Sequence, residues 1–453
     1  MNPPSRRAFL ASAGAIVAPS GCLDGGSPTD SPDGATPTAS DPASTPTNAD
    51  PTATATPPAT DSETESPPAT DAATETETPP PDSPAVAWQR RYDDSVTADP
   101  VVGEDLVVAG SESGTIRAYD HAGAELWTVE ESVPVQDLAM DDGTLLALLG
   151  TNELSSSQTV HALDASSGRE RWSFSPTDWW LEVLAVENGI AYVATADDVL
   201  EETGETLYAL AVDDGEPRWS ASIGDPREAV LTDDAVYVAS TGRTYAVDRA
   251  DGSERWDRPA EEIFTTLAAV DGTVVYAIDS ETEGRYSELL GLDAVTGEEQ
   301  WRFDSWAVTT TVAGDGDLFV GGARTASLDP TDGTVRWEHD TPGFLTDESL
   351  DAQRLYAGGD SLVAYDRESG GGGWSWTPDP PQGAVSAAGI TDGTLYLDSY
   401  HDADVRNQYK FAVEVDSDTG QWAFENETEL TDLAVGAGLT ATGGKDGRLY
   451  ALR

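Results

Sequence analysis

The sequence predicts an all-β fold, a single closed ring of four-stranded sheets. A unit of strand, tight turn and strand returns along the C-terminal four-fifths of the chain, and its best example is Val160-His-Ala-Leu-Asp-Ala-Ser-Ser-Gly-Arg-Glu-Arg-Trp172. The tryptophans that end these units are about 36 to 48 residues apart, and each interval holds four short apolar, β-prone runs. Both features are typical of the blades of a β-propeller.

Each unit contains the same three turn residues. The aspartate can accept backbone N–H groups and open the turn, the glycine can adopt the positive φ that closes it, and the tryptophan begins the next strand. The full sets are Asp164, Gly168 and Trp172; Asp248, Gly252 and Trp256; Asp293, Gly297 and Trp301; Asp329, Gly333 and Trp337; and Asp366, Gly370 and Trp374. Three units depart from the pattern: Ala211 replaces the aspartate, Tyr119 to Gly123 is one residue short, and Asp416 to Trp422 reads as two residues short.

The two ends of the repeat region complete each other. The C-terminal stretch Gly447-Arg-Leu-Tyr-Ala-Leu-Arg453 stops before its expected tryptophan, and the region begins with Ala85-Val-Ala-Trp88. We therefore expect the N-terminal segment to supply the outer strand of the last blade, which would remove the free sheet edges. The count is eight complete units plus one split unit, so either the ring has nine blades or one unit is irregular.

The repeated Leu-Asp-x-x-x-Gly-x-x-x-Trp unit resembles the pyrroloquinoline-quinone-like (PQQ-like) repeat over residues 85–453. This resemblance implies a propeller, with eight blades in most members. It also implies an enzyme hypothesis, because quinoprotein dehydrogenases of this kind hold a calcium-bound quinone over a tryptophan floor, beneath two adjacent cysteines. This chain has one cysteine, Cys22, far from the repeats. We therefore expect neither PQQ nor calcium, and we interpret the repeat tryptophans as packing between blades.

Residues 1–22 read as an export signal. Arg6 and Arg7, followed by Phe9 and Leu10, resemble the twin-arginine signal for folded proteins. The apolar run that follows is too short for a membrane-spanning helix, which needs about 20 residues. Cys22 follows small residues in a pattern that resembles a lipobox, although Pro19 stands where an aliphatic residue is preferred. We expect lipidation at Cys22.

Residues 23–84 are expected to form a disordered stalk. They are rich in Thr, Ser, Pro and acidic residues and contain no Lys, Arg or aromatic residue. Such a composition cannot bury enough apolar surface to offset the entropy of ordering. We expect this segment to hold the propeller, residues 85–453, away from the outer face of the cell membrane.

The charge is strongly acidic. The 83 Asp and Glu against 24 Lys and Arg give a net charge of −59, and Lys410 and Lys445 are the two lysines. Such a surface repels nucleic acid, so no nucleic-acid partner is expected. Self-repulsion of this size is tolerable in molar salt, where the Debye length is about 3 Å. The composition resembles that of proteins from extreme halophiles, here of a haloarchaeal type.

No constellation of residues assigns a catalytic or metal site. His121, His161, His339 and His401 fall in different units without ligand spacing. Carboxylates are so numerous that some pairs must come within catalytic reach by chance, so a hydrolase is neither indicated nor excluded. Asp315-Gly-Asp317 and Asp416-Ser-Asp-Thr-Gly420 coincide with expected turns and lack a full calcium ligand series.

One face of the ring is the candidate binding surface. The loops between the second and third strands of a blade vary most in length, at residues 150–158, 195–206, 279–287 and 398–408. These loops should emerge on the same face as the connections between blades, which carry Trp179, Trp180 and Trp306. Insertions gathered on one face often mark a binding surface, and exposed tryptophans there would be anchors. Equally, these tryptophans could pack against neighbouring blades.

The sequence thus favours an exported, lipid-anchored propeller that binds a protein or another extracellular ligand. The nearest type by resemblance is the propeller lipoprotein of bacterial outer-membrane assembly. The alternative is a quinoprotein dehydrogenase or another surface enzyme.

Overall fold

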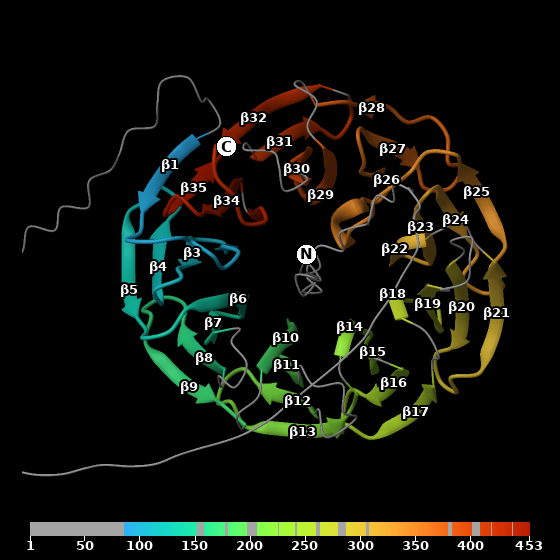
Figure 1. Cartoon of the computed structure of the whole chain (residues 1–453), viewed down its shortest axis with the longest axis horizontal. Coiled ribbons are helices and arrows are strands. Elements are labelled where there is room, and N and C mark those ends of the chain that lie inside the picture. Colours follow the sequence, from blue (N-terminus) through green and yellow to red (C-terminus); the bar gives the residue numbers. More distant parts are fainter. Residues whose placement is uncertain are drawn as a thin grey trace, which may run out of the picture. The chain divides into compact units, whose positions relative to one another are not determined.

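The computed structural model describes residues 86–453 apart from short gaps at residues 152–157, 177–179, 197–205, 225, 241, 260–262, 280–286, 305–307, 379–382, 401–407, 418 and 437. The described residues form nine sheets arranged around a ring (Figure 1). Eight sheets have four strands and one has three. The predicted propeller is confirmed, with nine blades in this part of the chain.

The blades are numbered along the chain. Blade 1 comprises β2 (Val101–Val102), β3 (Leu106–Gly110), β4 (Thr115–Asp120) and β5 (Glu125–Glu130). Blade 2 comprises β6 (Val135–Asp141), β7 (Thr144–Leu149), β8 (Thr159–Asp164) and β9 (Glu170–Phe174). Blade 3 comprises β10 (Trp180–Glu187), β11 (Ile190–Ala196), β12 (Thr206–Ala211) and β13 (Pro217–Ser222). Blade 4 comprises β14 (Pro226–Leu231), β15 (Ala235–Ser240), β16 (Arg243–Asp248) and β17 (Glu254–Pro259).

Blade 5 comprises β18 (Ile263–Val270), β19 (Thr273–Asp279), β20 (Ser287–Asp293) and β21 (Glu299–Asp304). Blade 6 comprises β22 (Val308–Gly314), β23 (Asp317–Gly322), β24 (Thr325–Leu328) and β25 (Val335–His339). Blade 7 comprises the 3-10 helix η1 (Asp347–Ser349), β26 (Arg354–Ala357), β27 (Leu362–Asp366) and β28 (Ser375–Trp376). Blade 8 comprises β29 (Ala384–Thr391), β30 (Thr394–Tyr400), β31 (Gln408–Glu414) and β32 (Gly420–Asn426). Blade 9 comprises β33 (Ala434–Gly436), β34 (Leu439–Gly444), β35 (Arg448–Leu452) and β1 (Val86–Arg91).

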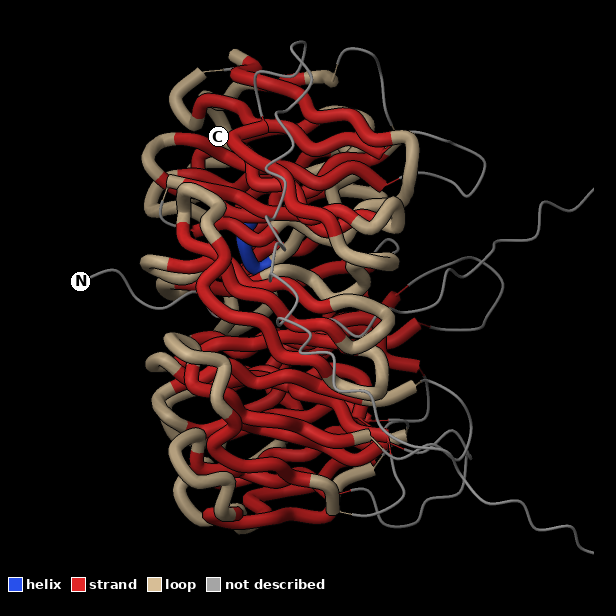
Figure 2. Tube along the Cα trace, turned by 90° about the vertical axis from the view of Figure 1, so that its left-hand side faces the viewer, coloured by secondary structure: helices blue, strands red, loops and turns tan. Residues whose placement is uncertain are grey.

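Each complete blade is an antiparallel meander whose first strand is innermost (Figure 1). The strands therefore run between two faces of the ring, and their turns gather at these faces (Figure 2). The hairpins between strands one and two and the turns between strands three and four share one face, which we call the turn face. The loops between strands two and three share the other face with the connections between blades, and we call it the loop face. The predicted insertions all fall between second and third strands, as expected.

The ring closes with strands from both ends of the propeller sequence. β1 pairs antiparallel with β35, with Val86 opposite Leu452 and Trp88 opposite Ala451. Blade 9 thus takes its outer strand from the N-terminal segment, which confirms the prediction from the split unit. Arg90 supports the closure, because its buried guanidinium donates to the carbonyl oxygen of Gly123 in blade 1.

Blade 7 is the irregular unit. Its sheet has three strands, and residues 344–350 take the place of the innermost strand. Phe344 bridges Gly358 and Leu350 bridges Leu355, while η1 interrupts the segment between them. From the sequence, either the ring has nine blades or one unit is irregular. The described residues form nine blades, and one of them, blade 7, is irregular.

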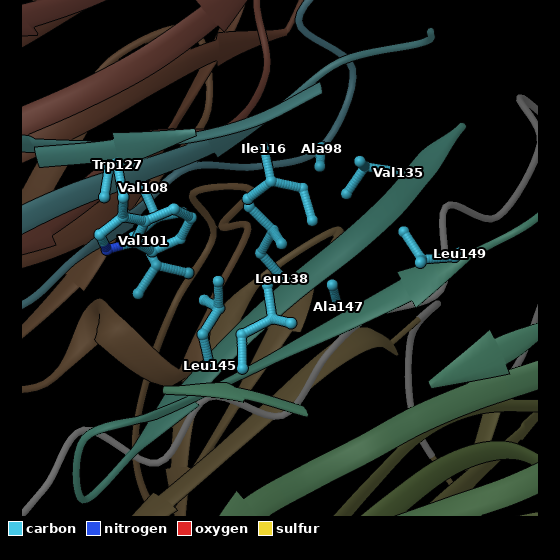
Figure 3. Close-up of a cluster of buried hydrophobic side chains, with 12 residues drawn as sticks. Ala98, Val101, Val108, Ile116, Trp127, Val135, Leu138, Leu145, Ala147 and Leu149 are labelled. Carbon is cyan, nitrogen blue, oxygen red and sulfur yellow. The ribbon is translucent and has the colours of Figure 1, made fainter. Parts of the chain in front are cut away.

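The core lies between neighbouring blades. Between blades 1 and 2 a buried cluster joins Ile116 and Trp127 to Leu138 and Leu145 (Figure 3). Small residues allow this close stacking: a Cβ at Gly110 would lie 2.4 Å from a Val135 methyl group. Burying a side chain such as leucine contributes about 1.5–3 kcal/mol, so stacking of blades is the main source of stability.

Ring closure can be tested by removing β1. Deleting residues 86–91 from the full chain leaves the edge of β35 unpaired, and open edges pair with other chains. We expect dimers or larger oligomers in molar salt, measured by size-exclusion chromatography with light scattering. Deleting six stalk residues, 40–45, is the matched control and should leave a monomer. A monomeric, equally stable variant without β1 would contradict the closure.

Candidate functional site

The repeat tryptophans form one recurring contact, which we call the clasp. The indole N–H of a tryptophan in one blade donates to the backbone carbonyl of the residue after the turn aspartate, or its equivalent, in the next blade. Eight clasps are formed by described residues, over 2.8–3.1 Å: Trp88 to His121, Trp127 to Ala165, Trp172 to Val212, Trp219 to Arg249, Trp256 to Ala294, Trp301 to Pro330, Trp337 to Arg367 and Trp374 to Val415. A buried or partly buried donor and acceptor therefore satisfy each other across each of these junctions.

Two features require glycine at this position of the turn: its backbone conformation and its contact with the clasp tryptophan. Gly168 has a φ of 68°, which disfavours residues with a side chain. A Cβ at Gly168 would also lie 2.6 Å from the Trp127 ring. Gly215 stands in the same way on Trp172. The glycine of one unit therefore contacts the tryptophan of the preceding unit, across the junction between two blades.

The same carbonyl-bearing residue joins the turn to the inner hairpin of its own blade. In blade 2 the N–H of Ala165 donates to the carbonyl of Gly143 over 3.0 Å, while its own carbonyl accepts the Trp127 indole. Val212 makes the equivalent bond to Gly189 over 2.9 Å. One residue per turn thus connects two strands of its blade to the preceding blade.

In blades 2, 4 and 6 the turn aspartate pairs with an arginine. Asp164 pairs with Arg171 over 2.8 Å and also accepts the hydroxyls of Ser166 and Ser167. These bonds, first of all the one from Arg171, hold the pKa of Asp164 well below its usual value. Arg255 lowers the pKa of Asp248 in the same way. These carboxylates are ionised and engaged, so they do not act as proton donors near neutral pH.

The turn between strands three and four also forms in the units whose sequence departs from the repeat. Ala211 replaces the aspartate in blade 3, yet Gly215 N–H still donates to its carbonyl over 2.8 Å, as in the other turns. The blade 1 turn is one residue short, as predicted, and Gly123 N–H donates to Asp120 over 2.8 Å. The reading of blade 8 was wrong. Glu414, which pairs with Thr394 as Asp164 pairs with Thr144, opens that turn, so its length is normal.

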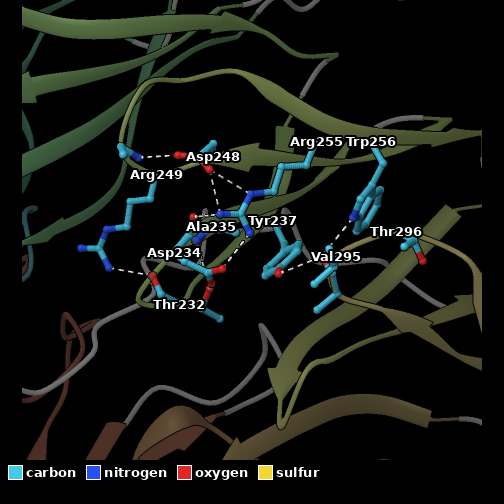
Figure 4. A network of polar contacts seen from close by, with 12 residues as sticks. Thr232, Asp234, Ala235, Tyr237, Asp248, Arg249, Arg255, Trp256, Val295 and Thr296 are labelled. Carbon is cyan, nitrogen blue, oxygen red and sulfur yellow. Dashed lines mark hydrogen bonds and ion pairs between the residues drawn. The ribbon is translucent and has the colours of Figure 1, made fainter.

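Two junctions carry a larger polar network on the turn face. In blade 4, Arg255 binds both Asp234 and Asp248, and Arg249 donates to the carbonyl of Thr232 (Figure 4). Arg249 also reaches back to blade 3, where it pairs with Glu187 over 2.5 Å. A hollow of about 500 Å³ lies over this network.

Arg367 repeats this arrangement between blades 6 and 7. It pairs with Asp315 and Asp317 of blade 6 and donates to the carbonyl of Gly314, and a hollow of about 560 Å³ lies above it. Asp315 and Asp317, which faintly resembled a calcium loop, are therefore ion-pair partners in a hairpin turn. In both hollows the arginines are already neutralised by carboxylates.

The candidate residues of the loop face are only partly described. Trp180 is the first residue of β10 and is half-buried. Trp179 and Trp306 lie outside the described residues, as do most residues of the four long loops between second and third strands. Cys22, Arg6 and Arg7 lie outside them as well.

The histidines are not brought together. His121 contacts the carbonyl of Gly103 in blade 1, His161 lies 3.3 Å from Glu131 near blade 2, and His339 contacts the carbonyl of Gly370 from blade 6. His401 lies outside the described residues. In the described part of the chain, no group of three or more His, Cys, Asp or Glu residues is placed to hold a metal ion. Nor does this part contain a helix long and apolar enough to cross a membrane.

Sequence reasoning missed a buried ion pair and a half-buried glutamate. Lys410 pairs with Asp398, and both are almost fully buried at the junction of blades 8 and 9. Asp398 also accepts the backbone N–H of Leu433 over 3.2 Å. Glu228 lies in the innermost strand of blade 4, and burial raises its pKa to about 8, despite a bond from the N–H of Leu267. A lysine in an otherwise apolar strand was the only signal for the first site, and the second had none.

Comparison with known proteins agrees with this architecture. A family model described as the outer membrane protein assembly factor BamB matches residues 81–154, 114–282, 203–344 and 285–432. These matches together span most of the chain. The chain belongs to this BamB-type family of PQQ-like repeats.

Individual relatives are more distant. The chain is 30% identical over 189 residues to the serine/threonine-protein kinase AfsK of Streptomyces coelicolor and 27% identical over 183 residues to AfsK of Streptomyces griseus. These matches cover 40% and 36% of the chain but only 21% of each kinase. Among solved structures, the computationally designed Ika8 protein is similar with a TM-score of 0.51 at 16% identity, over 80% of this chain and 97% of Ika8. BamB from Moraxella catarrhalis is 18% identical with a TM-score of 0.45, over 81% and 99% of the two chains.

Substitutions at two glycines distinguish the effect of the clasp contact on stability from the effect of backbone strain. Gly168 and Gly143 both have positive φ, but a Cβ at Gly143 would meet nothing within 4 Å. Gly143→Ala should cost about 1–2 kcal/mol of unfolding free energy, the cost of the left-handed backbone. Gly168→Ala should cost about 1–3 kcal/mol more, because its Cβ overlaps Trp127. Urea unfolding in molar salt measures both, and equal losses would show that the glycine does not serve the clasp.

Glu228 gives a pH-dependent test. Its pKa is raised when the protein is folded, so stability is lost as pH rises from the unfolded value near 4.5 towards 8. The Glu228→Gln variant has no carboxyl group to ionise, so it does not lose stability in this way. Its side-chain carbonyl can still accept the hydrogen bond from the N–H of Leu267. The variant should therefore be more stable than the parent at pH 8, by about 1–3 kcal/mol, and this gain should vanish at pH 4.5. Thermal unfolding between pH 4.5 and 8 measures it.

The matched control is Glu298→Gln, which removes the same charge from an exposed turn. A stability gain at pH 8 no larger for Glu228→Gln than for this control would contradict the raised pKa.

Proposed function

We propose that this protein is an exported, lipid-anchored scaffold whose propeller binds a protein partner at the cell surface. Membership of the BamB-type family carries the proposal, since the protein for which that family is described is an assembly factor. The loop face is the proposed binding surface. The residues that recur in most units are used in clasps on the turn face, whereas the loop face holds the segments of variable length.

The anchor is proposed at Cys22, after export directed by Arg6 and Arg7. Residues 23–84 then form the spacer between the lipid and the propeller. A flexible chain of this length has a mean end-to-end distance of about 45 Å, and its prolines extend it further. This reach allows the ring to turn towards a neighbouring protein while it remains attached to the membrane.

The acidic composition supports a role in concentrated salt. The arginines of the described junctions are paired with carboxylates, as Arg249, Arg255 and Arg367 show, so the unpaired excess of acid faces solvent. Molar salt screens the repulsion among these carboxylates. We infer a haloarchaeal type of cell surface, facing a strongly saline medium.

A quinoprotein dehydrogenase remains the alternative enzyme hypothesis. Its cofactor would need a tryptophan as a floor, and eight repeat tryptophans are already engaged in clasps. Calorimetric titration with PQQ and calcium in molar salt decides this directly. Saturable binding of about one equivalent would favour the enzyme over the scaffold.

The loop face can be compared with the turn face by photo-crosslinking in the native membrane. A photoreactive amino acid replaces Val133, which is 38% exposed in a connection between blades, or Val295, which is 68% exposed in a turn. We expect a discrete adduct with one surface protein from position 133 and none from position 295. Reciprocal adducts, or none from either position, would refute the proposed binding face.

A further inference from the structure

The sequence contains one acceptor motif for N-linked glycosylation, Asn426-Glu427-Thr428. Of the six asparagines in the chain, only Asn426 stands two residues before a serine or threonine with a residue other than proline between them. Such a glycan is bulky and is carried on the protein surface, so the place of the motif in the folded ring decides whether it is a modification site or a chance match.

The structure places this motif at an open edge of a sheet. Asn426 is the last residue of β32, the outermost strand of blade 8, and it pairs with Gln408 of β31 (Figure 1). Within the described residues no strand pairs with the outer edge of β32. Asn426 is half-buried, and Glu425 and Glu427 on either side of it are exposed. An enzyme can therefore approach the motif from outside the ring while blade 8 stays folded.

Hydrogen bonds within the motif fix the carboxamide of Asn426. Its Oδ1 accepts the backbone N–H of Thr428 over 3.0 Å and the Thr428 hydroxyl over 3.2 Å. The amide nitrogen carries two N–H groups, and a bond to the Tyr450 hydroxyl uses one of them. Replacement of the other hydrogen by a sugar therefore leaves every one of these bonds in place.

The chain that follows the motif is held against blade 9. The backbone N–H of Lys445 donates to the carbonyl of Glu429 over 2.9 Å, and the Lys445 ammonium pairs with the Glu429 carboxylate. Lys445 lies between β34 and β35, the second and third strands of blade 9. Because these two strands are joined on the loop face, the motif lies on that face, at the outer rim of the ring.

We propose that Asn426 is glycosylated after export. This inference rests on the proposed function, since a chain exported in its folded state presents only its folded surface to enzymes outside the cell. In the reaction, Nδ2 of Asn426 forms a bond to the anomeric carbon of a sugar that is held on a lipid phosphate. The bond between that carbon and the phosphate oxygen breaks, the lipid phosphate leaves, and Nδ2 loses one proton.

A glycan at Asn426 restricts the surface that a partner can use. It projects from the rim of the loop face at blades 8 and 9, and its bulk keeps another protein from packing closely there. A partner on the loop face then has to bind away from this rim.

Mass spectrometry of the protein purified from its native membrane tests the proposal. Trypsin cleaves after Lys410 and Lys445, and the peptide of residues 411–445 contains Asn426, no internal arginine or lysine, and no part of the stalk. We expect this peptide to carry the added mass of one or more sugars, and fragmentation to place them on Asn426. The Asn426→Gln variant should lose the added mass completely.

Two changes at residue 428 separate the chemistry of the motif from its fold. Thr428→Ser keeps the hydroxyl that the motif requires, so it should keep the glycan. Thr428→Val has nearly the same shape without the hydroxyl, and it should lose the glycan although Asn426 is still present. Equal modification of these two variants would overturn the proposal. An added mass that persists in Asn426→Gln would do so as well, because the sugar would then be attached to a serine or threonine.

The position of the chain in the cell distinguishes failure of this inference from failure of the proposed function. An antibody against the propeller, applied to intact cells, reports whether the ring is outside. Unmodified Asn426 in a chain that the antibody reaches would refute the glycosylation and leave the export standing. Unmodified Asn426 in a chain that the antibody reaches only after lysis would refute both.

Discussion

The hydrogen bond from a tryptophan indole to the carbonyl of the next blade is the interaction on which the ring depends. A propeller blade has no hydrophobic core of its own and is stable only against its neighbours. Apolar packing between blades supplies most of the stabilising free energy, but it does little to fix the orientation of one blade against the next. The clasp adds direction, because Trp172 and the carbonyl of Val212 would each be buried without a partner if the blades rotated apart.

Two arginines at clasp positions connect neighbouring blades. Arg249 and Arg367 occupy the clasp position in their blades and reach back to acidic groups of the preceding blade. Arginine suits this role because its planar fork makes several bonds at once and is weakly hydrated. The two lysines are also paired, Lys410 with Asp398 and Lys445 with Glu429. Arg249, Arg367 and Lys410 thus connect structural elements, whereas Lys445 and Glu429 form an exposed pair.

The junction of blades 8 and 9 contains an unusual buried ion pair. Asp398 and Lys410 place a buried ion pair where other blades have small or apolar residues, and Asp398 binds the backbone of blade 9. Burying two charges is costly, but each charge then permits only the register that brings it to its partner. This constraint lies beside blade 9, whose outer strand comes from the N-terminal segment.

Local sequence determined the fold of this protein to a large extent. The Asp, Gly and Trp spacing fixed the turns, the apolar runs fixed four strands per unit, and the split unit at Trp88 predicted the closure and the count of nine, because each depends on residues within one repeat. The sequence also carried the export and anchoring hypotheses, which concern residues outside the described structure. Only the tertiary structure decided what the repeat residues contact. Gly168 meets Trp127 from another blade, and Glu414 rather than Asp416 opens its turn. These are contacts between segments far apart in the chain, and a local pattern holds no information about which partner will stand opposite it.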